Sequence, residues 1–184
     1  MKIISGILKG RNLDGYNIEG TRPTMDRVKE SIFSTIQFYI KDSIVLDLFS
    51  GSGNYSFESF SNGAKELYLN DKNMKCINYI KNTITKFNID SKKFHLTNMD
   101  YKDCLSYYKN HNIKFNLVFL DPPYKMSICS EIIDYLYNNN MLLDNSLIIV
   151  EVNDYFGISN YDNLTLYKEK KYGDKTVFIY KYKV

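Results

Sequence analysis

Residues 44–53 read IVLDLFSGSG, an apolar run that passes directly into a glycine-rich turn. A short run of Ile, Val and Leu that ends in turn residues is typical of a buried parallel strand. Gly51 and Gly53 allow the backbone to bend sharply after this strand and to come close to a ligand. The segment therefore predicts a strand, a ligand-binding turn and the start of a helix, in that order.

The same alternation of strand and helix continues along the chain. Strand-like runs cover 66–70, 92–97, 115–120 and 146–152, helical segments lie between them (the first a short helix that stops at Gly63, then 73–87, 101–108 and 127–139), and 164–183 predicts a closing β-hairpin. Ahead of the first strand, residues 1–12 suit a small hairpin or extended arm, and residues 25–40 suit an amphipathic helix capped by Thr24. This order predicts an α/β fold, a doubly wound, Rossmann-like, seven-stranded mixed sheet with a small N-terminal hairpin and helix.

Bulk composition restricts the class of protein. The 184 residues are 44% hydrophobic and 24% charged, which is ordinary for one globular domain, expected as an N-terminal arm and helix (1–42) and a core (43–184). No apolar run approaches the roughly 18 residues that cross a bilayer, so no membrane partner is expected. The three scattered cysteines and two histidines lack ligand spacing, which favours a reduced, cytoplasmic protein without a metal. We further expect a monomer.

Acidic residues follow three of the predicted strands, at Asp47, Asp71 and Asp100. Because the carboxyl ends of parallel strands share one edge of a sheet, we expect these carboxylates to surround one ligand. Asp47, close to the glycine turn, would repel a pyrophosphate but attract an ammonium or a sulfonium. Asp71 suits ribose hydroxyls, and Asp100 suits an adenine amino group. Together these groups describe S-adenosylmethionine (SAM), although each acid can instead cap a helix or end a strand.

A second cluster ends the fourth strand, where residues 115–124 read FNLVFLDPPY. The prolines after Asp121 keep the next residues out of a helix. The Asp121 carboxylate and the Pro122 carbonyl can accept hydrogen bonds from an amine, and the Tyr124 ring can stack on a planar group. The stretch therefore predicts a pocket for a planar amine. The alternative is a turn that does no more than end the strand.

With these motifs, the chain resembles class I SAM-dependent methyltransferases and, more narrowly, the RsmD family, which methylates the 2-amino group of a guanine in bacterial small-subunit ribosomal RNA. The resemblance includes IISGILKGRNL, TRPTMDRVKESIF, DLFSGSG, FLDPPY and KKYGDKTVFIY, and so runs essentially end to end. It implies SAM contacts at Asp47, Phe49, Gly51, Gly53, Asp71, Lys72 and Asp100, and a catalytic base pocket at Asp121, Pro122, Pro123 and Tyr124. Departures from the family pattern occur at 54–56, Asn73 and Met99.

The resemblance also implies a partner, which is ribosomal RNA or the small ribosomal subunit. Candidate RNA contacts are Lys9, Arg11, Arg22, Thr24 and Lys29, although the charged ones can equally be ordinary surface residues. In the implied reaction, the guanine amine is held by Asp121 and the Pro122 carbonyl while it attacks the methyl group of SAM. Two alternatives stay open: an amino methyltransferase acting on DNA adenine or a protein glutamine, and a catalytically silent RNA-binding module.

Overall fold

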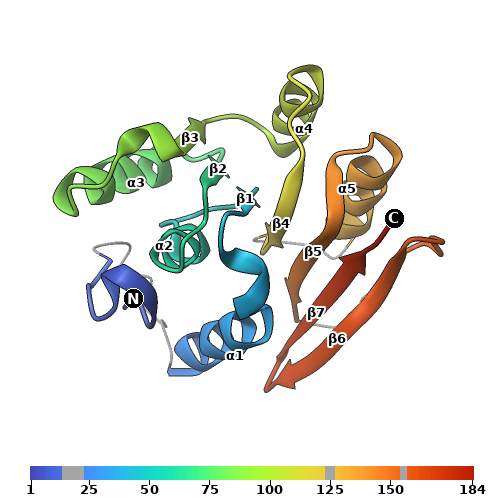
Figure 1. The fold of residues 1–184 in the computed structure, drawn as a ribbon, viewed down its shortest axis with the longest axis horizontal. Helices are drawn as coiled ribbons and strands as arrows, with labels where there is room; N and C mark the ends of the chain where they lie inside the picture. The colour runs from blue at the N-terminus through green and yellow to red at the C-terminus, as the bar shows by residue number, and fades with distance from the viewer. Residues whose placement is uncertain (14–22, 123–126, 154–156) are drawn as a thin grey trace.

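The computed structural model describes residues 1–13, 23–122, 127–153 and 157–184, with the side chains of 23–25 and 127 outside the description. Helices and strands alternate as predicted (Figure 1). The helices are α1 (Pro23–Ile40), α2 (Asn54–Ser61), α3 (Met74–Lys86), α4 (Tyr101–Asn110) and α5 (Ser127–Asn138), with the 3-10 turns η1 (Gly6–Leu8) and η2 (Ser91–Lys93). The strands are β1 (Ile44–Asp47), β2 (Glu66–Asn70), β3 (Phe94–Thr97), β4 (Phe115–Leu120), β5 (Leu142–Val152), β6 (Leu164–Tyr172) and β7 (Lys175–Tyr182).

Within the described residues, seven strands form one sheet in the order β3-β2-β1-β4-β5-β7-β6. The strands β1 to β5 pair in parallel, whereas β7 runs antiparallel to both β5 and β6. The order reverses between β1 and β4, which are side by side with Asp47 opposite Phe119. Ligands of open α/β sheets bind outside the carboxyl ends of the strands at such a reversal. The doubly wound, Rossmann-like fold predicted from the sequence is confirmed.

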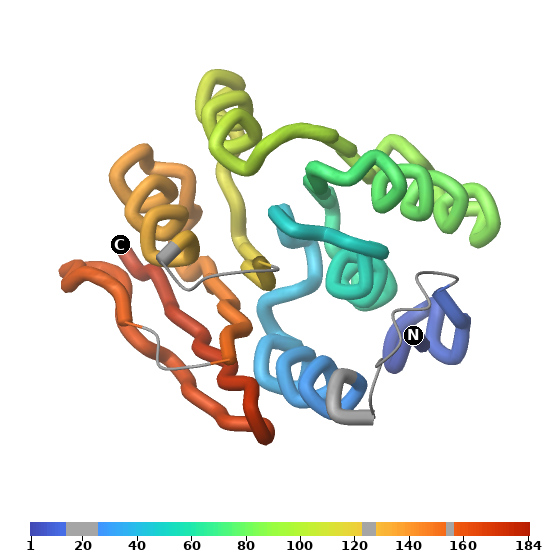
Figure 2. The backbone as a smooth tube through the Cα atoms, turned by 180° about the vertical axis from the view of Figure 1, so that it is seen from behind, coloured from blue at the N-terminus to red at the C-terminus, as the bar shows by residue number. Residues whose placement is uncertain are grey.

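Alternate residues of the central strands face opposite layers of helices, because side chains of a strand alternate between its two faces. Val45 and Phe119 pack in a cluster with the apolar sides of α1, α2 and α3, whereas Leu46 and Val118 pack with α4 and α5. Figures 1 and 2 show the same division, with the N-terminal arm on the side of α1 to α3. The inward face predicted for α3 is also confirmed, since its predicted apolar residues are buried.

The N-terminal arm, residues 1–13, is a short loop with an isolated bridge between Lys2 and Asn12. Within it the Ile3 amide donates to the Arg11 carbonyl at 3.0 Å, and η1 occupies the centre of the loop. Ile3 and Leu8 are buried in the same cluster as α1 and α2. The predicted hairpin therefore takes the form of a loop packed on the core, and not of two extended strands.

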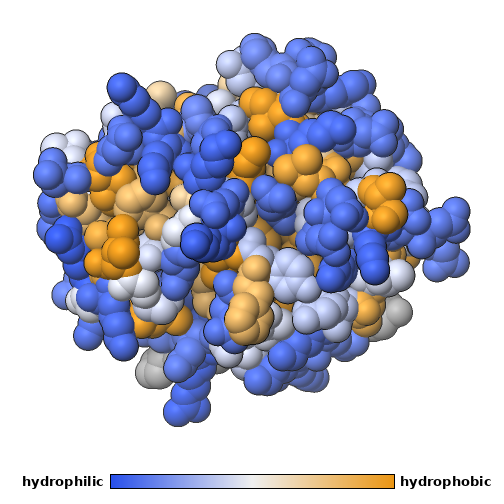
Figure 3. Space-filling view, viewed as in Figure 1, coloured by the Kyte–Doolittle hydropathy of each residue, from blue (hydrophilic) through white to orange (hydrophobic). Residues whose placement is uncertain are grey.

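Hydrophilic side chains cover most of the face seen in Figure 3, with apolar side chains in separate patches between them. Among the described residues, no helix is both long enough and apolar enough to cross a membrane. The described part of the chain also contains no group of three or more His, Cys, Asp or Glu side chains that could hold a metal ion.

Candidate active site

The glycine-rich turn after β1 is fixed to the neighbouring strand β2. Ser50 donates to the Asn70 carbonyl from its amide at 2.9 Å and from its hydroxyl at 3.0 Å. Gly53 has a φ of +79°, and a Cβ there would lie 2.9 Å from the Phe57 ring, so a side chain is opposed by both strain and contact. A Cβ at Gly51 would meet nothing within 4 Å. The turn therefore leaves open space on its outer side.

Asp71 braces this turn from the end of β2. One carboxylate oxygen accepts from the Gly51 amide at 2.9 Å, and the other accepts from the Asn73 amide at 2.8 Å. The cap of α3 is Asn73, whose side chain accepts from the Lys75 amide. Because each carboxylate oxygen can accept a second hydrogen bond, Asp71 retains capacity for two hydroxyl donors.

Asp100 caps α4, since its carboxylate accepts from the Lys102 amide at 3.0 Å. The capping alternative is therefore realised for this acid. Its other oxygen lies 3.8 Å from the Lys72 ammonium, so the two residues predicted to contact the cofactor after β2 and β3 come together. The Phe49 ring, two residues beyond β1, has its centroid 5.8 Å from that of the Tyr101 ring, which brings Phe49 to the same edge. Direct contact of these residues with a ligand stays a prediction.

Asp47 lies beneath the glycine turn. It is only 3% exposed, and it accepts a 2.7 Å hydrogen bond from the Ser56 hydroxyl. Burial raises the pKa of Asp47 to about 7, because the carboxylate loses hydration, and the Ser56 hydrogen bond opposes this effect. Ser56, one of the departures from the family pattern, is thus the partner of a buried acid. Contact of Asp47 with a ligand ammonium stays a prediction.

A cleft of about 620 Å³, part of it open to solvent, lies at the reversal of the sheet. It is lined by residues of the arm, the glycine turn, the start of α2 and the ends of β4 and β5, namely Met1, Phe49, Ser50, Gly51, Ser52, Asn54, Tyr55, Asp121 and Glu151. The structure therefore brings the glycine turn and Asp121 into one cleft. Pro122 ends this described segment, and Pro123 and Tyr124 lie outside the described residues.

Asp121 lines this cleft with a perturbed carboxyl group. Burial raises the pKa of Asp121 to about 7, the negative charges of Glu151 and Asp47 raise it as well, and Lys175 opposes them. A carboxyl group with a pKa near neutrality changes between a proton-donating and a proton-accepting form at physiological pH. Asp121 is therefore suited to hold an amine or to exchange a proton with it.

Tyr55, Glu151 and Lys175 also belong to this site, and the sequence analysis did not predict them. Glu151 lies next to Asp121, because β4 and β5 are parallel and in register at their ends. The Glu151 carboxylate accepts from the Tyr55 hydroxyl and forms an ion pair with Lys175. A signal for Glu151 was present in the sequence, since it ends a buried strand in the same way as the predicted acids do.

The predicted RNA contacts have different surroundings. Lys9 is exposed. Arg11 donates from its guanidinium to the Phe87 carbonyl at 3.3 Å and lies over the Phe87 ring, which ties the arm to the end of α3. Arg22 and the side chain of Thr24 lie outside the described residues.

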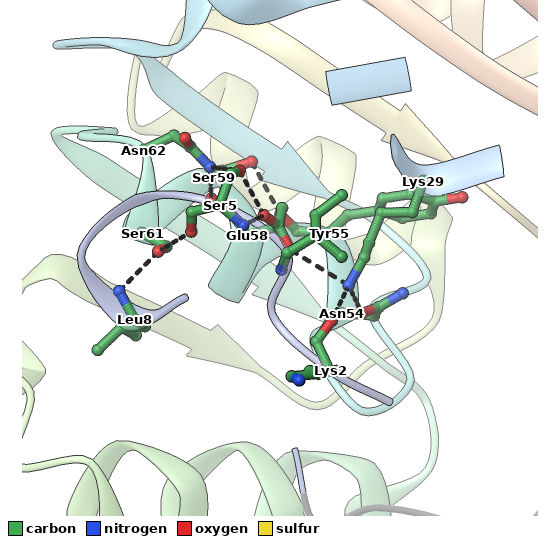
Figure 4. A network of polar contacts seen from close by, with 11 residues as sticks. Lys2, Ser5, Leu8, Lys29, Asn54, Tyr55, Glu58, Ser59, Ser61 and Asn62 are labelled. Carbon is green, nitrogen blue, oxygen red and sulfur yellow. Dashed lines mark hydrogen bonds and ion pairs between the residues drawn. The ribbon is translucent and has the colours of Figure 1, made fainter. Parts of the chain in front are cut away.

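The structure corrects the prediction for Lys29. Its side chain is 1% exposed, and its ammonium lies 3.1 Å from the Glu58 carboxylate. It also donates to the Lys2 carbonyl at 2.6 Å and to the Asn54 side chain at 2.9 Å, and dashed lines mark these contacts in Figure 4. Because the ammonium is enclosed and engaged, it does not reach an RNA phosphate. Lys29 instead joins the arm, α1 and the start of α2, where Asn54 lines the cleft.

Comparison with known sequences gives matches over almost the whole chain. Residues 1–181 match the family model described as Conserved hypothetical protein 95. The chain is also 36% identical, over 173 residues, to the ribosomal RNA small subunit methyltransferase D of Haemophilus influenzae. That match covers 94% of this chain and 89% of the relative.

Solved structures are similar over the same extent. An Escherichia coli structure, described provisionally as a methyltransferase, has a TM-score of 0.84 and 26% identity, and the match covers 100% of this chain and 98% of that one. A Haemophilus influenzae structure, described provisionally as a methylase, has a TM-score of 0.81 and 32% identity, with 100% and 99% covered. The likeness therefore includes the arm, the sheet and the closing hairpin.

Proposed function

This chain belongs to the ribosomal RNA small subunit methyltransferase D family, and we propose that it transfers a methyl group from SAM to the 2-amino group of a guanine in small-subunit ribosomal RNA. The observation that carries the proposal is the cleft shared by the glycine turn and Asp121. A cleft at the reversal of a sheet suits a methyl donor and a planar amine held in contact. We also propose that the protein acts in the cytoplasm, and a ribosomal substrate supports this location.

The residues around the turn fit SAM. Asp71 retains acceptor capacity for ribose hydroxyls, and the open side of Gly51 gives room for the ligand. Acids close to the turn suit a ligand that carries a sulfonium and an ammonium. When bound, SAM supplies an electrophilic methyl group. The residues proposed to hold it are Asp47, Phe49, Gly51, Gly53, Asp71, Lys72 and Asp100.

Asp121 supplies the acceptor that a weakly reactive amine needs. The lone pair of a guanine 2-amino group is delocalised into the ring, so the amine is a poor nucleophile. A hydrogen bond from the amine to the Asp121 carboxylate localises this lone pair and stabilises the positive charge that develops on nitrogen. With a pKa raised to about 7, the same carboxylate can also take up the released proton.

The residues after Asp121 complete the proposed base pocket. The Pro122 carbonyl is proposed as the second acceptor for the amine, and Pro123 is proposed to belong to the same pocket. Tyr124 is proposed to stack on the base, which contributes about 1–3 kcal/mol. On the RNA side, Lys9 and Arg11 of the arm are proposed to lie near phosphates, together with Arg22 and Thr24.

The variant Asp121→Ala tests this proposal. Tritiated methyl transfer to small ribosomal subunits from cells that lack the gene should fall at least about 100-fold, because the acceptor is lost in the transition state. SAM affinity by calorimetry should stay within about twofold of the wild type, since the glycine turn is intact. A matched control is Glu131→Ala, an exposed acid of α5 paired with Lys102, which should leave both quantities unchanged.

The same assay separates the proposed substrate from its rivals. DNA and protein fractions tested side by side should receive no methyl groups above background. Near-normal turnover of the Asp121 variant contradicts the role of the carboxylate, and transfer to DNA or protein but not to RNA contradicts the substrate.

We also propose that the chain acts as one domain and as a monomer. Ile3 and Leu8 of the arm share a core cluster with Val28 of α1 and with the sheet, which supports one domain. Sedimentation velocity should show a species of 21.6 kDa. A species of twice that mass contradicts the monomer.

A further inference from the structure

Tyr55 and Glu151 line the cleft, Lys175 pairs with Glu151, and the methyl transfer proposed above assigns no role to any of the three. Glu151 lines the cleft although it is only 7% exposed. Its carboxylate accepts from the Tyr55 hydroxyl and pairs with the Lys175 ammonium. An ion pair that is largely removed from water is a weak source of stability, because both ions lose hydration. Its position in a ligand cleft points to a role in binding.

Three elements hold the Glu151 carboxylate in one place. Glu151 itself belongs to the buried end of β5, and Lys175 is the first residue of β7. The Tyr55 ring, from α2, lies parallel to the Phe119 ring with centroids 5.0 Å apart, which fixes the direction of its hydroxyl. Since each carboxylate oxygen can accept two hydrogen bonds, both oxygens retain capacity for a further donor. Glu151 is therefore a fixed acceptor immediately beside Asp121.

When Asp121 holds the amino group of a base, the neighbouring atom of the base faces Glu151, and this atom differs between bases. In guanine, the ring nitrogen N1 next to the 2-amino group carries a hydrogen and donates. In adenine and cytosine, the ring nitrogen next to the amino group carries a lone pair, and in a glutamine amide the neighbouring atom is a carbonyl oxygen. A fixed carboxylate accepts a hydrogen bond from guanine N1–H. It repels the lone pairs that adenine, cytosine and a glutamine amide present in the same place.

We infer that Glu151 selects guanine by accepting a hydrogen bond from its N1–H while Asp121 accepts from its 2-amino group. Lys175 and Tyr55 act as positioning residues that hold the Glu151 carboxylate. The inference rests on the proposed methylation of a guanine amine and adds the residue that recognises the base. It also gives a physical reason why the same cleft rejects adenine and glutamine.

The base 2-aminopurine separates the two contacts, because it keeps the 2-amino group but has a lone pair at N1. Small ribosomal subunits are reconstituted with RNA that carries guanine or 2-aminopurine at the nucleotide methylated by the wild-type protein. The wild type should prefer guanine by at least about 100-fold in kcat/KM, as expected for a site built around a donor. Glu151→Gln, whose amide can donate to N1, should reduce the preference below about tenfold.

Asp121→Asn is the matched control, because Asp121 contacts an amine that both bases carry. It should slow methylation of both particles and leave their ratio unchanged. Each ratio compares kcat/KM for the two particles on one protein sample. A smaller folded fraction in a variant lowers both values equally and does not change the ratio.

The outcomes distinguish a failure of the role given to Glu151 from a failure of the proposed methyltransferase function. A wild-type protein that methylates both particles equally, or a Glu151→Gln variant with the wild-type ratio, overturns the role given to Glu151. A wild-type protein that methylates neither particle overturns the proposed function itself.

Discussion

Replacement of Lys29 by methionine should destabilise the fold strongly. The change keeps an unbranched apolar stem in the buried position but removes the ammonium. The lost contacts are the ion pair with Glu58 at 3.1 Å and the hydrogen bonds to the Lys2 carbonyl at 2.6 Å and to Asn54 at 2.9 Å. Glu58, with a side chain that is 0% exposed, is then left as a buried carboxylate without its cation.

The size of the effect follows from what remains around Glu58. Removal of one member of a buried ion pair costs about 3–5 kcal/mol. Three donors stay with the Glu58 carboxylate, the amides of Ile4 and Ser5 and the Ser5 hydroxyl, at 3.0, 2.9 and 2.7 Å. They keep the cost at the lower end, so we expect a loss of about 3 kcal/mol. With a urea m-value of about 2 kcal/mol per M, the unfolding midpoint should fall by about 1.5 M.

Urea unfolding followed by circular dichroism at pH 7 measures this shift, with Lys9→Met as the control. Lys9 is an exposed lysine of the same arm, and its replacement should change stability by no more than about 0.5 kcal/mol. The double variant Lys29→Met/Glu58→Gln should be more stable than Lys29→Met, because no charge is left unpaired. If Lys29→Met unfolds at the midpoint of Lys9→Met but binds RNA less tightly, Lys29 contacts a phosphate after all and the buried pairing is refuted.

Three further predictions concern the carboxylates of the site. Asp71→Ala should weaken SAM binding at least about tenfold in calorimetry, since ribose acceptors and the brace on the turn are lost; unchanged affinity contradicts the ribose contact. The pKa of Asp47 rises from 3.8 to about 7 on folding. Between pH 3.8 and about pH 7, the folded state therefore keeps a proton on Asp47 that the unfolded state has released. The free energy of unfolding therefore falls as pH rises through this window, by at most about 4 kcal/mol from this group. Urea titrations at pH 4 and pH 8 should show a smaller fall for Asp47→Asn than for the wild type. The carboxylate of Asp121 accepts more strongly from the amine than the neutral carboxyl group does, and only the carboxylate can take up the released proton. Because its pKa is raised to about 7, kcat/KM should increase as pH rises through 7. A profile that is flat from pH 6 to 8 would show that the proton on Asp121 does not limit the reaction.

Local patterns in the sequence predict most of the fold. The apolar spacing of α3 and the buried runs of β1, β2 and β4 depend on neighbours a few residues away, and the structure has these elements close to the predicted bounds. The start of β5 is different. The sequence predicts a strand that begins only at residue 146, after the polar Asp144 and Asn145, and Asn145 has a φ of +59° in the structure. In the structure they belong to β5, where the pairing with β4 changes register.

The sequence predicts candidate site residues that directly follow strands. It does not predict contacts between segments that are far apart in the chain. The rule that acids collect at the carboxyl ends of strands predicted Asp121, which lines the cleft, and Asp71, which braces the glycine turn. The same rule applied to the fifth strand would have pointed to Glu151. The inward position of Lys29 also had a signal, since it is three and four residues before the buried Ile32 and Phe33 of α1. Its partner Glu58 had none, because the burial of that acid depends on an arm more than 50 residues away in sequence.

The acids at this edge of the sheet are better suited to a protein with a cationic ligand bound than to the ligand-free protein. The negative charges of Glu151 and Asp47 raise the pKa of Asp121, and Lys175 is the cation that opposes this rise. Burial and the neighbouring acids raise the pKa of Asp121 to about 7, so a large share of this carboxyl group is protonated at neutral pH, and the neutral form is a weaker acceptor for an amine than the carboxylate. A ligand with a sulfonium and an ammonium nearby favours the carboxylate instead. A cationic methyl donor in the cleft therefore increases the share of Asp121 that is in the carboxylate form, so the occupied cleft holds the amine more strongly than the empty one.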